Sequence, residues 1–309
     1  MSLRLFLTLL EPMMHHDTSS GDLNADRRLS YAEAMLAGGD PVAAAEIMAD
    51  AMLLAPDWVA GWVRYGEMAE AAGLHEAARA AYEAALGRDP ADRFGASLHL
   101  MYLTDCPVTD TAPAAHMQAL FDQYAPRFEA SLVDALGYCA PTLLAAYLEG
   151  HLGRALDLGC GTGLMGGAIK GRFDHLTGYD ISTGMLEQAR RKGIYDMLEQ
   201  HDLNALPAVV PQYDLVVTAD VLIYFGALEQ IIEWSASALV SGGRLALTVE
   251  KTTGRDFRLQ KSRRFAHSED YIRRLLSVAG LNALRLEHTS YRKEQGADVP
   301  TMLVIAQKP

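Results

Sequence analysis

Cysteine is scarce in this chain of 309 residues, and the three cysteines lie far apart in the sequence. Cys106, Cys139 and Cys160 lack the paired spacing of a zinc site, and three residues are too few for the disulfide framework of a small secreted protein. We therefore expect neither a bound metal nor disulfide bonds. A reducing, cytoplasmic compartment is the simplest interpretation of this composition.

Long apolar runs and an excess of basic residues are also missing. The first ten residues are mostly apolar, but Glu11-Pro12 follows directly and no small-residue cleavage site is present. We therefore predict neither a signal peptide nor a membrane span. Lysine and arginine number 27 against 39 acidic residues, which gives a net charge of −12. Because a nucleic-acid binder needs a positive surface, this balance argues against nucleic acid as a partner.

A repeat with a period of 34 residues is present in the first third of the chain. Pro56 and Pro90 are separated by this period, and so are Gly39 and Gly73. The period is typical of tetratricopeptide repeats, in which pairs of helices stack on their neighbours. Such helices either form a groove for a peptide or protein partner, or support dimerisation or cover another domain. The sequence leaves both roles open.

Composition and periodicity predict three parts. Residues 1–24 are expected to be a flexible segment, and tetratricopeptide-like helices with a capping helix are predicted over 25–104. A second domain covers 112–309: it opens with helices over 112–150 and continues with alternating strands and helices over 151–309. This alternation predicts an α/β fold with a doubly wound, seven-stranded sheet that binds ligands at the carboxyl ends of its strands. The last two strands follow each other without a helix, which predicts an antiparallel C-terminal hairpin.

The glycine-rich stretch LDLGCGTGLMGG marks the expected ligand site. Glycines let the backbone approach a ligand closely, and the helix that follows directs its free N–H groups and its dipole toward the same place. Gly161, Gly163 and Gly166 satisfy the G-x-G-x-x-G pattern of dinucleotide-binding proteins, with Asp180 about 20 residues further along. Against NAD, Asp157 places a charge inside the first strand, where a dinucleotide-binding strand is normally apolar. The glycine motif alone leaves the ligand open.

Four motifs in order resemble those of class I S-adenosylmethionine-dependent methyltransferases. They are LDLGCGTG at the first strand, YDIS at the end of the second, His201-Asp202 after the third and YDLVVTADVLIYF at the fourth. The resemblance covers residues 114–309, about two-thirds of the chain. With the repeats in front, the chain is most similar to bacterial tetratricopeptide-containing predicted methyltransferases. The resemblance implies a Rossmann-like fold, S-adenosylmethionine as cofactor and S-adenosylhomocysteine as product.

The resemblance also implies which residues contact the cofactor. The loop glycines would pack against its methionine and ribose parts, and Asp157 would either orient the loop or accept a hydrogen bond from the methionine ammonium. Asp180 would accept hydrogen bonds from both ribose hydroxyls, and Asp202 would accept one from the adenine amine unless it is simply a loop acid. Tyrosines of the opening helices would close over the cofactor. The complete implied set is Asp157, Gly159, Cys160, Gly161, Gly163, Asp180, Ile181, Met185, Asp202, Leu203, Ala219, Tyr124 and Tyr138.

The sequence names three candidates for catalysis, because methyl transfer needs mainly alignment, desolvation and, for some acceptors, a base. Tyr224, Glu250 and His267 are expected at the carboxyl edge of the sheet. His267 is the predicted general base because the pKa of histidine is near neutrality. The alternative is that it only precedes the start of the next helix and has no catalytic role. The basic residues over Lys251–Arg264 would either attract an anionic substrate or form a solvated loop. Arg292 at the C-terminal hairpin is open to the same two interpretations.

Three functions remain open at this point. The first is methyl transfer to a small-molecule or protein nucleophile, with the repeats recruiting the substrate or a partner. The second is a non-catalytic scaffold or sensor that binds S-adenosylmethionine. An NAD-binding oxidoreductase is the third. The sequence does not identify the methyl acceptor or its nucleophilic atom.

Overall fold

A computed structural model describes residues 19–105, 110–134, 137–294 and 296–309. The chain divides into two compact units, of which one ends at His116 and the other is Met117–Pro309. Most of the segment predicted to be flexible, 1–24, lies outside the described residues. The first described helix begins at Leu23, where the side chain of Asp22 caps it. Within the described residues, no helix combines the length and the apolar composition of a membrane span.

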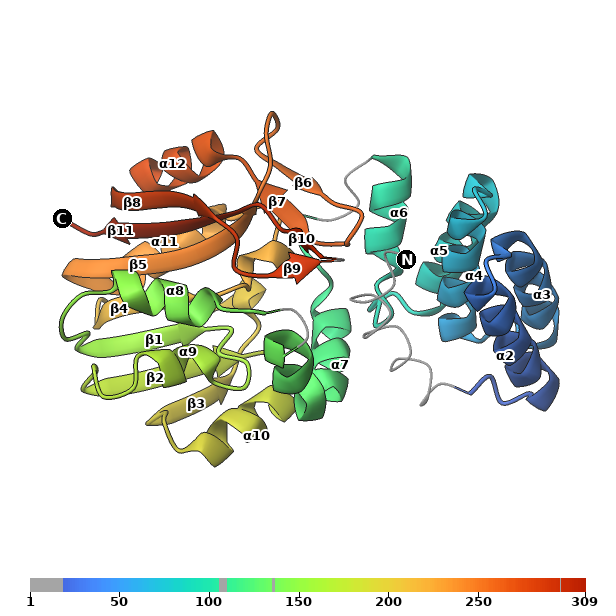
Figure 1. The fold of residues 1–309 in the computed structure, drawn as a ribbon, viewed down its shortest axis with the longest axis horizontal. Helices are drawn as coiled ribbons and strands as arrows, with labels where there is room; N and C mark the ends of the chain where they lie inside the picture. Colours follow the sequence, from blue (N-terminus) through green and yellow to red (C-terminus); the bar gives the residue numbers. More distant parts are fainter. Residues whose placement is uncertain (1–18, 106–109, 135–136, 295) are drawn as a thin grey trace. The chain divides into compact units, whose positions relative to one another are not determined.

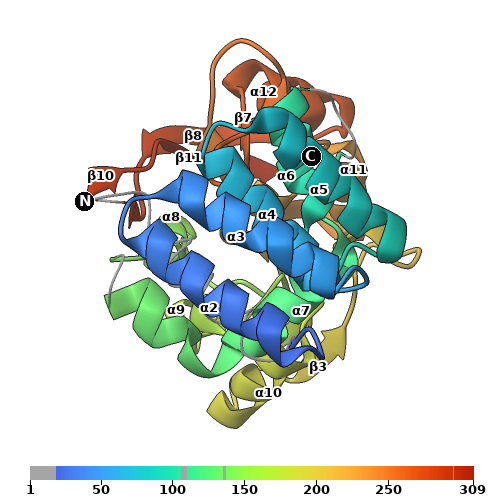
Figure 2. The same cartoon turned by 90° about the vertical axis from the view of Figure 1, so that its right-hand side faces the viewer.

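The first unit is helical, and consecutive helices pack against each other (Figure 2). Its helices are α2 (Leu23–Ala37), α3 (Pro41–Leu54), α4 (Val59–Ala71), α5 (His75–Arg88) and α6 (Ala96–Thr104). The same turn follows α2 and α4. Gly39 and Gly73, one period of 34 residues apart, have φ values of 88° and 75°. Glycine adopts this left-handed conformation without a Cβ penalty, which explains its place at both helix ends.

Small residues let the paired helices approach closely. A Cβ atom on Gly66 would lie 2.4 Å from the ring of Tyr82, which is fully buried. The positions one period earlier hold Ala32 and Met48, and both are fully buried as well. The unit is therefore built from two similar helix pairs. Their assignment to tetratricopeptide repeats stays a prediction.

The second unit is a mixed sheet with helices on both faces (Figure 1). The strands are β1 (Arg154–Leu158), β2 (His175–Asp180), β3 (Met197–Gln200), β4 (Tyr213–Thr218), β5 (Leu239–Lys251), β6 (Phe257–Leu259), β7 (Phe265–His267), β8 (Asn282–Thr289), β9 (Lys293–Glu294), β10 (Ala297–Asp298) and β11 (Thr301–Gln307). The helices are α7 (Ala114–Tyr124), α8 (Ala140–Tyr147), α9 (Leu164–Ala168), α10 (Thr183–Lys192), α11 (Glu229–Ala238) and α12 (Glu269–Val278).

The strand order is β3-β2-β1-β4-β5-β11-β8. The first five strands of this path are parallel, and β11 is antiparallel to both β5 and β8. The α/β class with an antiparallel end therefore agrees with the expectation from the sequence. The sheet also contains β6 and β7, which the seven-strand prediction did not include, whereas β9 and β10 pair with each other in a separate two-stranded sheet. Each has only three residues, too few to show an apolar alternation in the sequence.

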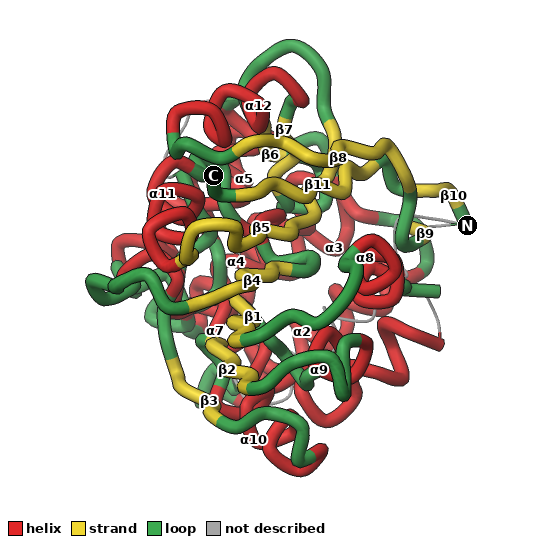
Figure 3. Tube along the Cα trace, turned by 90° about the vertical axis from the view of Figure 1, so that its left-hand side faces the viewer, coloured by secondary structure: helices red, strands yellow, loops and turns green. Residues whose placement is uncertain are grey.

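Helices lie on both faces of the sheet (Figure 3), and alternate residues of the central strands belong to two different cores. Ala155, Leu215 and Ala246 belong to the core formed with α8 and α9. Their neighbours Leu156 and Val216 belong to the core formed with α11 and α12. Because successive side chains of a strand point to opposite faces, both faces of the sheet must be apolar here. Polar groups can therefore gather only at the ends of the strands.

Leu156→Ala should destabilise the second unit by about 2–5 kcal/mol, since it removes buried methyl groups and leaves a cavity in the central strand. Leu156 is 0% exposed, whereas Leu284 on β8 is 57% exposed. Urea denaturation followed by circular dichroism measures both effects, and Leu284→Ala is the matched control, expected within about 0.5 kcal/mol of the wild type. Equal losses in the two variants would contradict the assigned core.

Candidate functional site

The loop between β1 and α9 turns sharply at three glycines. Gly159, Gly161 and Gly163 have φ values of 71°, 53° and 87°, which other residues rarely adopt. A Cβ on Gly159 would lie 2.4 Å from Val221, and one on Gly163 would lie 2.9 Å from Tyr195. At Gly161 a Cβ would meet no described atom within 4 Å. The loop is therefore packed at its two ends and open at its middle glycine.

Asp157 is a buried carboxylate with one unpaired oxygen. Its Oδ2 accepts a hydrogen bond from the Tyr195 hydroxyl at 2.6 Å, whereas Oδ1 is buried without a partner among the described residues. Burial raises the pKa of Asp157 to about 7, although the hydrogen bond from Tyr195 lowers it. An unpaired buried acceptor costs free energy, so a ligand group that donates a hydrogen bond would be stabilised here.

Tyr195 holds the glycine loop, and the sequence analysis missed it. Its hydroxyl accepts from the N–H of Gly166 at 3.2 Å in addition to donating to Asp157. A Cβ on Gly166 or Gly178 would lie within 2.8 Å of the tyrosine side chain. Glycine is therefore required at these places for steric reasons. A tyrosine in a connecting segment matches no motif, so only the packing reveals this role.

Asp180 ends β2 and connects the glycine loop to α10. Its Oδ2 accepts from the N–H of Gly161 and its Oδ1 from the N–H of Ser182, both at 2.8 Å. Burial raises the pKa of Asp180 to about 6, against these backbone hydrogen bonds, which lower it. The side chain of Ser182 caps α10 by accepting from the N–H of Met185. The structure thus brings Asp180 and the glycine loop together, as the sequence predicted.

Helix α7 lies over the carboxyl ends of these strands. Asp122 Oδ1 accepts from the Ser182 hydroxyl at 2.6 Å and from the N–H of Gly184 at 2.9 Å. The ring of Phe121 meets that of Tyr224 edge-on, with 5.5 Å between centroids. These contacts join α7 both to the start of α10 and to the segment after β4. No motif in the sequence identified Asp122.

The two predicted tyrosines of the opening helices are both buried. Tyr124 packs edge-on against Phe128 at 5.4 Å, and Tyr138 packs edge-on against Tyr291 at 6.0 Å. Burial raises the pKa of Tyr138 well above its ordinary value, and the nearby carboxylate of Asp220 adds to the increase. Tyr138 therefore lies beside the segment after β4.

The other residues predicted to bind the cofactor lie around the same strand ends. Asp202 accepts from the N–H of Asn204 at 2.9 Å and caps the short helix Leu203–Ala205, so its capping role is real whatever else it contacts. Cys160, Met185 and Leu203 are buried, whereas Ile181 and Ala219 are partly buried.

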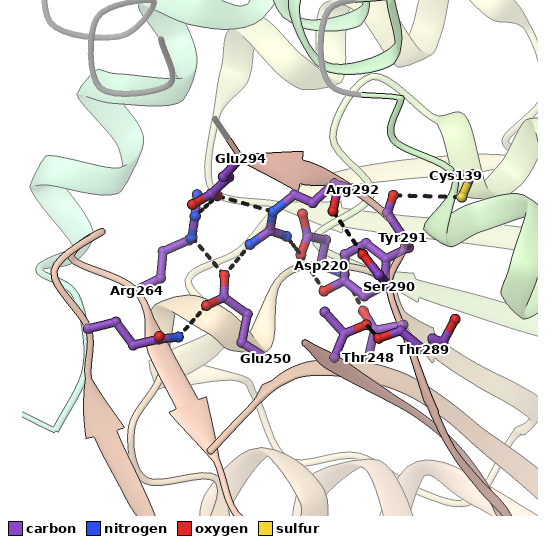
Figure 4. A network of polar contacts seen from close by, with 12 residues as sticks. Cys139, Asp220, Thr248, Glu250, Arg264, Thr289, Ser290, Tyr291, Arg292 and Glu294 are labelled. Atoms are coloured by element: carbon purple, nitrogen blue, oxygen red, sulfur yellow. Dashed lines mark hydrogen bonds and ion pairs between the residues drawn. The ribbon is translucent and has the colours of Figure 1, made fainter. Parts of the chain in front are cut away.

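A buried group of charges lies beyond the ends of β4 and β5 (Figure 4). We call Asp220, Glu250, Arg264, Arg292 and Glu294 the charge cluster. Arg292 contacts Asp220 and Glu250 through its two terminal nitrogens and Glu294 through Nε. Arg264 donates from Nε to Glu250 Oε1 at 2.8 Å and also pairs with Glu294. Arg264 is only 3% exposed, so the interpretation of its segment as a solvated loop is wrong at this residue.

Tyr224 and Glu250 are placed at this edge of the sheet, as expected. Burial raises the pKa of Tyr224 to about 12, so its phenol is neutral near pH 7. Glu250 accepts from Arg264, Arg292 and Gln260. With these partners Glu250 serves to hold the two guanidinium groups in place.

His267 does not fit its predicted role as general base. Its side chain is fully buried, and Nε2 lies 2.8 Å from the carbonyl oxygen of Phe225 and 3.1 Å from that of Gly226. Burial lowers the pKa of His267 to about 4, so the ring is neutral near pH 7 and donates to these carbonyls. The ring also stacks on Tyr271. His267 therefore anchors the segment after β4 to β7. Its role differs from the one expected from the sequence because its ring is buried and uncharged.

Comparison with known proteins gives one family match and several relatives. Residues 155–243 match the family model described as a methyltransferase domain. Methyltransferase-like protein 27 of Homo sapiens is 34% identical over 128 residues, which cover 39% of this chain and 49% of that protein. A malonyl-(acyl-carrier protein) O-methyltransferase of Enterobacter lignolyticus is 31% identical over 109 residues, which cover 35% of this chain and 43% of that protein. The chain spans about half the length of the curated relatives it matches.

Over residues 155–243 the chain is therefore similar to a methyltransferase domain. A structural likeness to the complex between the Haloferax volcanii Trm112 methyltransferase activator and a methyltransferase concerns the fold, with 17% identity and a TM-score of 0.51. That likeness covers 61% of this chain and 97% of the other. The matched residues include Asp157, the glycine loop, Asp180 and the segment after β4.

Replacing Asp157 should change how stability of the methyltransferase domain depends on pH. The pKa of Asp157 is raised from 3.8 to about 7, so the folded protein binds its proton more tightly than the unfolded chain. The free energy of unfolding therefore falls as the pH rises from about 4 to about 7. Asp157→Asn removes this titration and keeps an acceptor for Tyr195. Urea denaturation should show the variant gaining on the order of 4 kcal/mol over wild type across this range; a constant difference would contradict the buried, titrating carboxylate.

Proposed function

We propose that the protein transfers a methyl group from S-adenosylmethionine to a nucleophile of a small molecule or a protein. The observation that carries the proposal is the buried, unpaired Oδ1 of Asp157 beside the open backbone of Gly161. When bound, S-adenosylmethionine supplies a methyl group already activated on a sulfonium, whose departure leaves a neutral thioether. The protein then has to hold, align and desolvate the reactants.

The residues present fit this cofactor. Asp157 Oδ1 is an acceptor in need of a donor, which suits the ammonium of the methionine part. Asp180 already accepts two backbone N–H groups, and a carboxylate has further lone pairs for two ribose hydroxyls. The positive φ at Gly161, with free space where a Cβ would be, supports close approach of the loop backbone.

The remaining contacts with the cofactor are proposed from the same strand ends. Ile181 and Met185 would pack on the adenine. Asp202 would accept a hydrogen bond from the adenine amine through the carboxylate oxygen that does not cap the helix Leu203–Ala205. The other residues proposed to line the cofactor are Gly159, Cys160, Gly163, Leu203, Ala219, Tyr124 and Tyr138. Glu250 and Tyr224 act at the acceptor side, Glu250 by holding the guanidinium groups and Tyr224 as a neutral phenol. His267 is not included, because its ring is committed to the interior.

The alternative is a non-catalytic scaffold or sensor that binds the same cofactor. Binding alone cannot separate it from an enzyme, because both need the same loop. Methyl transfer from labelled S-adenosylmethionine to small-molecule and peptide libraries separates them: turnover identifies the enzyme, and binding without turnover favours the sensor. An NAD-binding oxidoreductase is less favoured, since a buried charge at Asp157 is expensive beside a dinucleotide and suits a cationic ligand group.

We further propose that the helical unit recruits the substrate or a partner. Its support is the separate compact folding of the two units and the large apolar side chains exposed on α2, where Tyr31 is 65% exposed and Met35 40%. Turnover of the acceptor by the full chain and by residues 112–309 tests this role. We expect a KM at least tenfold higher for the shorter chain with S-adenosylhomocysteine affinity retained. Equal KM values would remove the recruiting role.

Asp180→Asn should weaken S-adenosylhomocysteine binding at least thirtyfold, because the amide cannot accept from both the loop and the ribose hydroxyls. Isothermal titration calorimetry measures the affinity. Asp174→Asn is the matched control at the other end of β2, where the side chain is 72% exposed and pairs with His151. We expect the control to bind as the wild type does. Failure of the wild type to bind at millimolar ligand would refute the proposed function, and unchanged binding in Asp180→Asn would show that this carboxylate does not contact the ligand.

A further inference from the structure

Asp220 is held rigidly beside the cofactor loop. Its φ is 61°, a left-handed conformation that a residue other than glycine keeps only when its surroundings hold it there. Its N–H donates to Thr248 Oγ1 at 2.8 Å. The next residue, Val221, occupies the space that a Cβ on Gly159 would need. The segment after β4 and the glycine loop are therefore in direct contact.

One oxygen of Asp220 is committed and the other is not. Oδ1 accepts from the Tyr291 hydroxyl at 2.6 Å and pairs with Arg292, as Figure 4 shows. Oδ2 has no protein partner within the part of the chain that the structure describes, and the side chain is 12% exposed. Tyr138 lies within electrostatic reach of both Asp220 and Asp157. Oδ2 is thus a fixed hydrogen-bond acceptor on the side of the cofactor loop that would face the methyl acceptor.

The charge cluster carries more negative than positive charge. Its three carboxylates are Asp220, Glu250 and Glu294, and its two guanidinium groups, Arg264 and Arg292, are both paired with these carboxylates. Its formal charge is therefore −1 with all five groups ionised. A substrate carboxylate brought to Asp220 would face a further negative charge at low dielectric, which is unfavourable. A neutral group that donates a hydrogen bond would be favoured.

We propose that Asp220 Oδ2 accepts a hydrogen bond from the group that is methylated, and that this group is a hydroxyl or an amine rather than a carboxylate. This proposal rests on the proposed methyl transfer and names the substrate class of the same site. A lone pair of the oxygen or nitrogen forms the bond to the methyl carbon, the carbon–sulfur pair stays on sulfur, and the released proton passes to Asp220 Oδ2 and then to water. Tyr291 and Arg292 keep the carboxylate in place by occupying Oδ1.

Asp220→Asn tests the proposal because its amide has a predictable orientation. Arg292 and Tyr291 are donors, so they select the amide oxygen, and the amide NH₂ then replaces Oδ2. The substitution therefore replaces a hydrogen-bond acceptor by a donor at the position of Oδ2. Asparagine also tolerates a left-handed backbone, so the variant is expected to fold. Glu233→Gln on α11, an exposed site outside the charge cluster, removes the same charge as a control.

The probes are aniline, phenol and benzoate, titrated by ligand-observed NMR against the full chain saturated with S-adenosylhomocysteine. We expect the wild type and Glu233→Gln to bind aniline or phenol more tightly than benzoate. In Asp220→Asn the ratio of benzoate affinity to aniline affinity should rise at least tenfold. The tighter of aniline and phenol in the wild type indicates whether nitrogen or oxygen is preferred. With an acceptor that is turned over, kcat of Asp220→Asn should fall at least about a hundredfold.

Two measurements keep this proposal separate from the proposed function. Calorimetry with S-adenosylhomocysteine on the same preparations tests the cofactor site, and we expect wild type and Asp220→Asn to agree within threefold. An unchanged benzoate-to-aniline ratio in Asp220→Asn overturns the role of Asp220 while the cofactor site stands. Tighter binding of benzoate than of both donors to the wild type, or no binding of either donor at millimolar concentration, overturns it equally. Loss of S-adenosylhomocysteine binding in the wild type refutes the proposed function itself.

Discussion

The burial of β1 on both faces is the constraint on which the site depends. Leu156 packs toward α11 and α12, and Ala155 packs toward α8 and α9, so the strand has no face that meets water. Backbone and side-chain polar groups must then be satisfied at the strand's end. Asp157 is the exception inside the strand. Its carboxylate has one partner among the described residues, Tyr195. The other oxygen is left to accept a hydrogen bond from a ligand at the glycine loop.

Two polar groups of different composition meet at the carboxyl edge of the sheet. The first, at the ends of β1 and β2, holds carboxylates and backbone N–H groups and contains Asp157 and Asp180. The second, beyond β4 and β5, is the charge cluster with its paired guanidinium groups. Val221 against Gly159 joins them. In the proposed function, cofactor binding and recognition of the methyl acceptor would therefore depend on side chains from different strands.

The segments that complete the charge cluster come from parts of the chain distant in sequence. Arg264 precedes β7, Arg292 precedes β9, and Asp220 follows β4. Each guanidinium is buried, which is tolerable only because carboxylates face it from other elements. This dependence explains why the sequence left Arg264 and Arg292 open between a solvated role and an anion-binding one. The two arginines lie on different segments, and apart from Glu294 beside Arg292 the compensating carboxylates come from other segments and meet them only after folding.

The predictions that succeeded from the sequence depend on local signals. Apolar runs alternating with helical periods identified the α/β class, and the glycines after β1 with Asp180 at the end of β2 marked the loop. The two three-residue strands β6 and β7 were missed, because such short segments carry no periodic pattern. His267 was placed correctly at a strand end but given the wrong role. Its pKa depends on burial, which a motif does not contain.

The sequence by itself determined the order of elements, the glycine loop and the acids inside β1 and at the end of β2, since each depends on neighbours within a few residues. The tertiary structure alone decided which polar atoms stay unpaired. Asp157 Oδ1 and Asp220 Oδ2 are distinguished from the other carboxylate oxygens of the site only by partners that come from distant segments, Tyr195 in one case and Tyr291 with Arg292 in the other. Hydrogen bonding between such segments forms only when the sheet is assembled. In the proposed function, this pairing leaves one hydrogen-bond acceptor for the cofactor and one for the substrate.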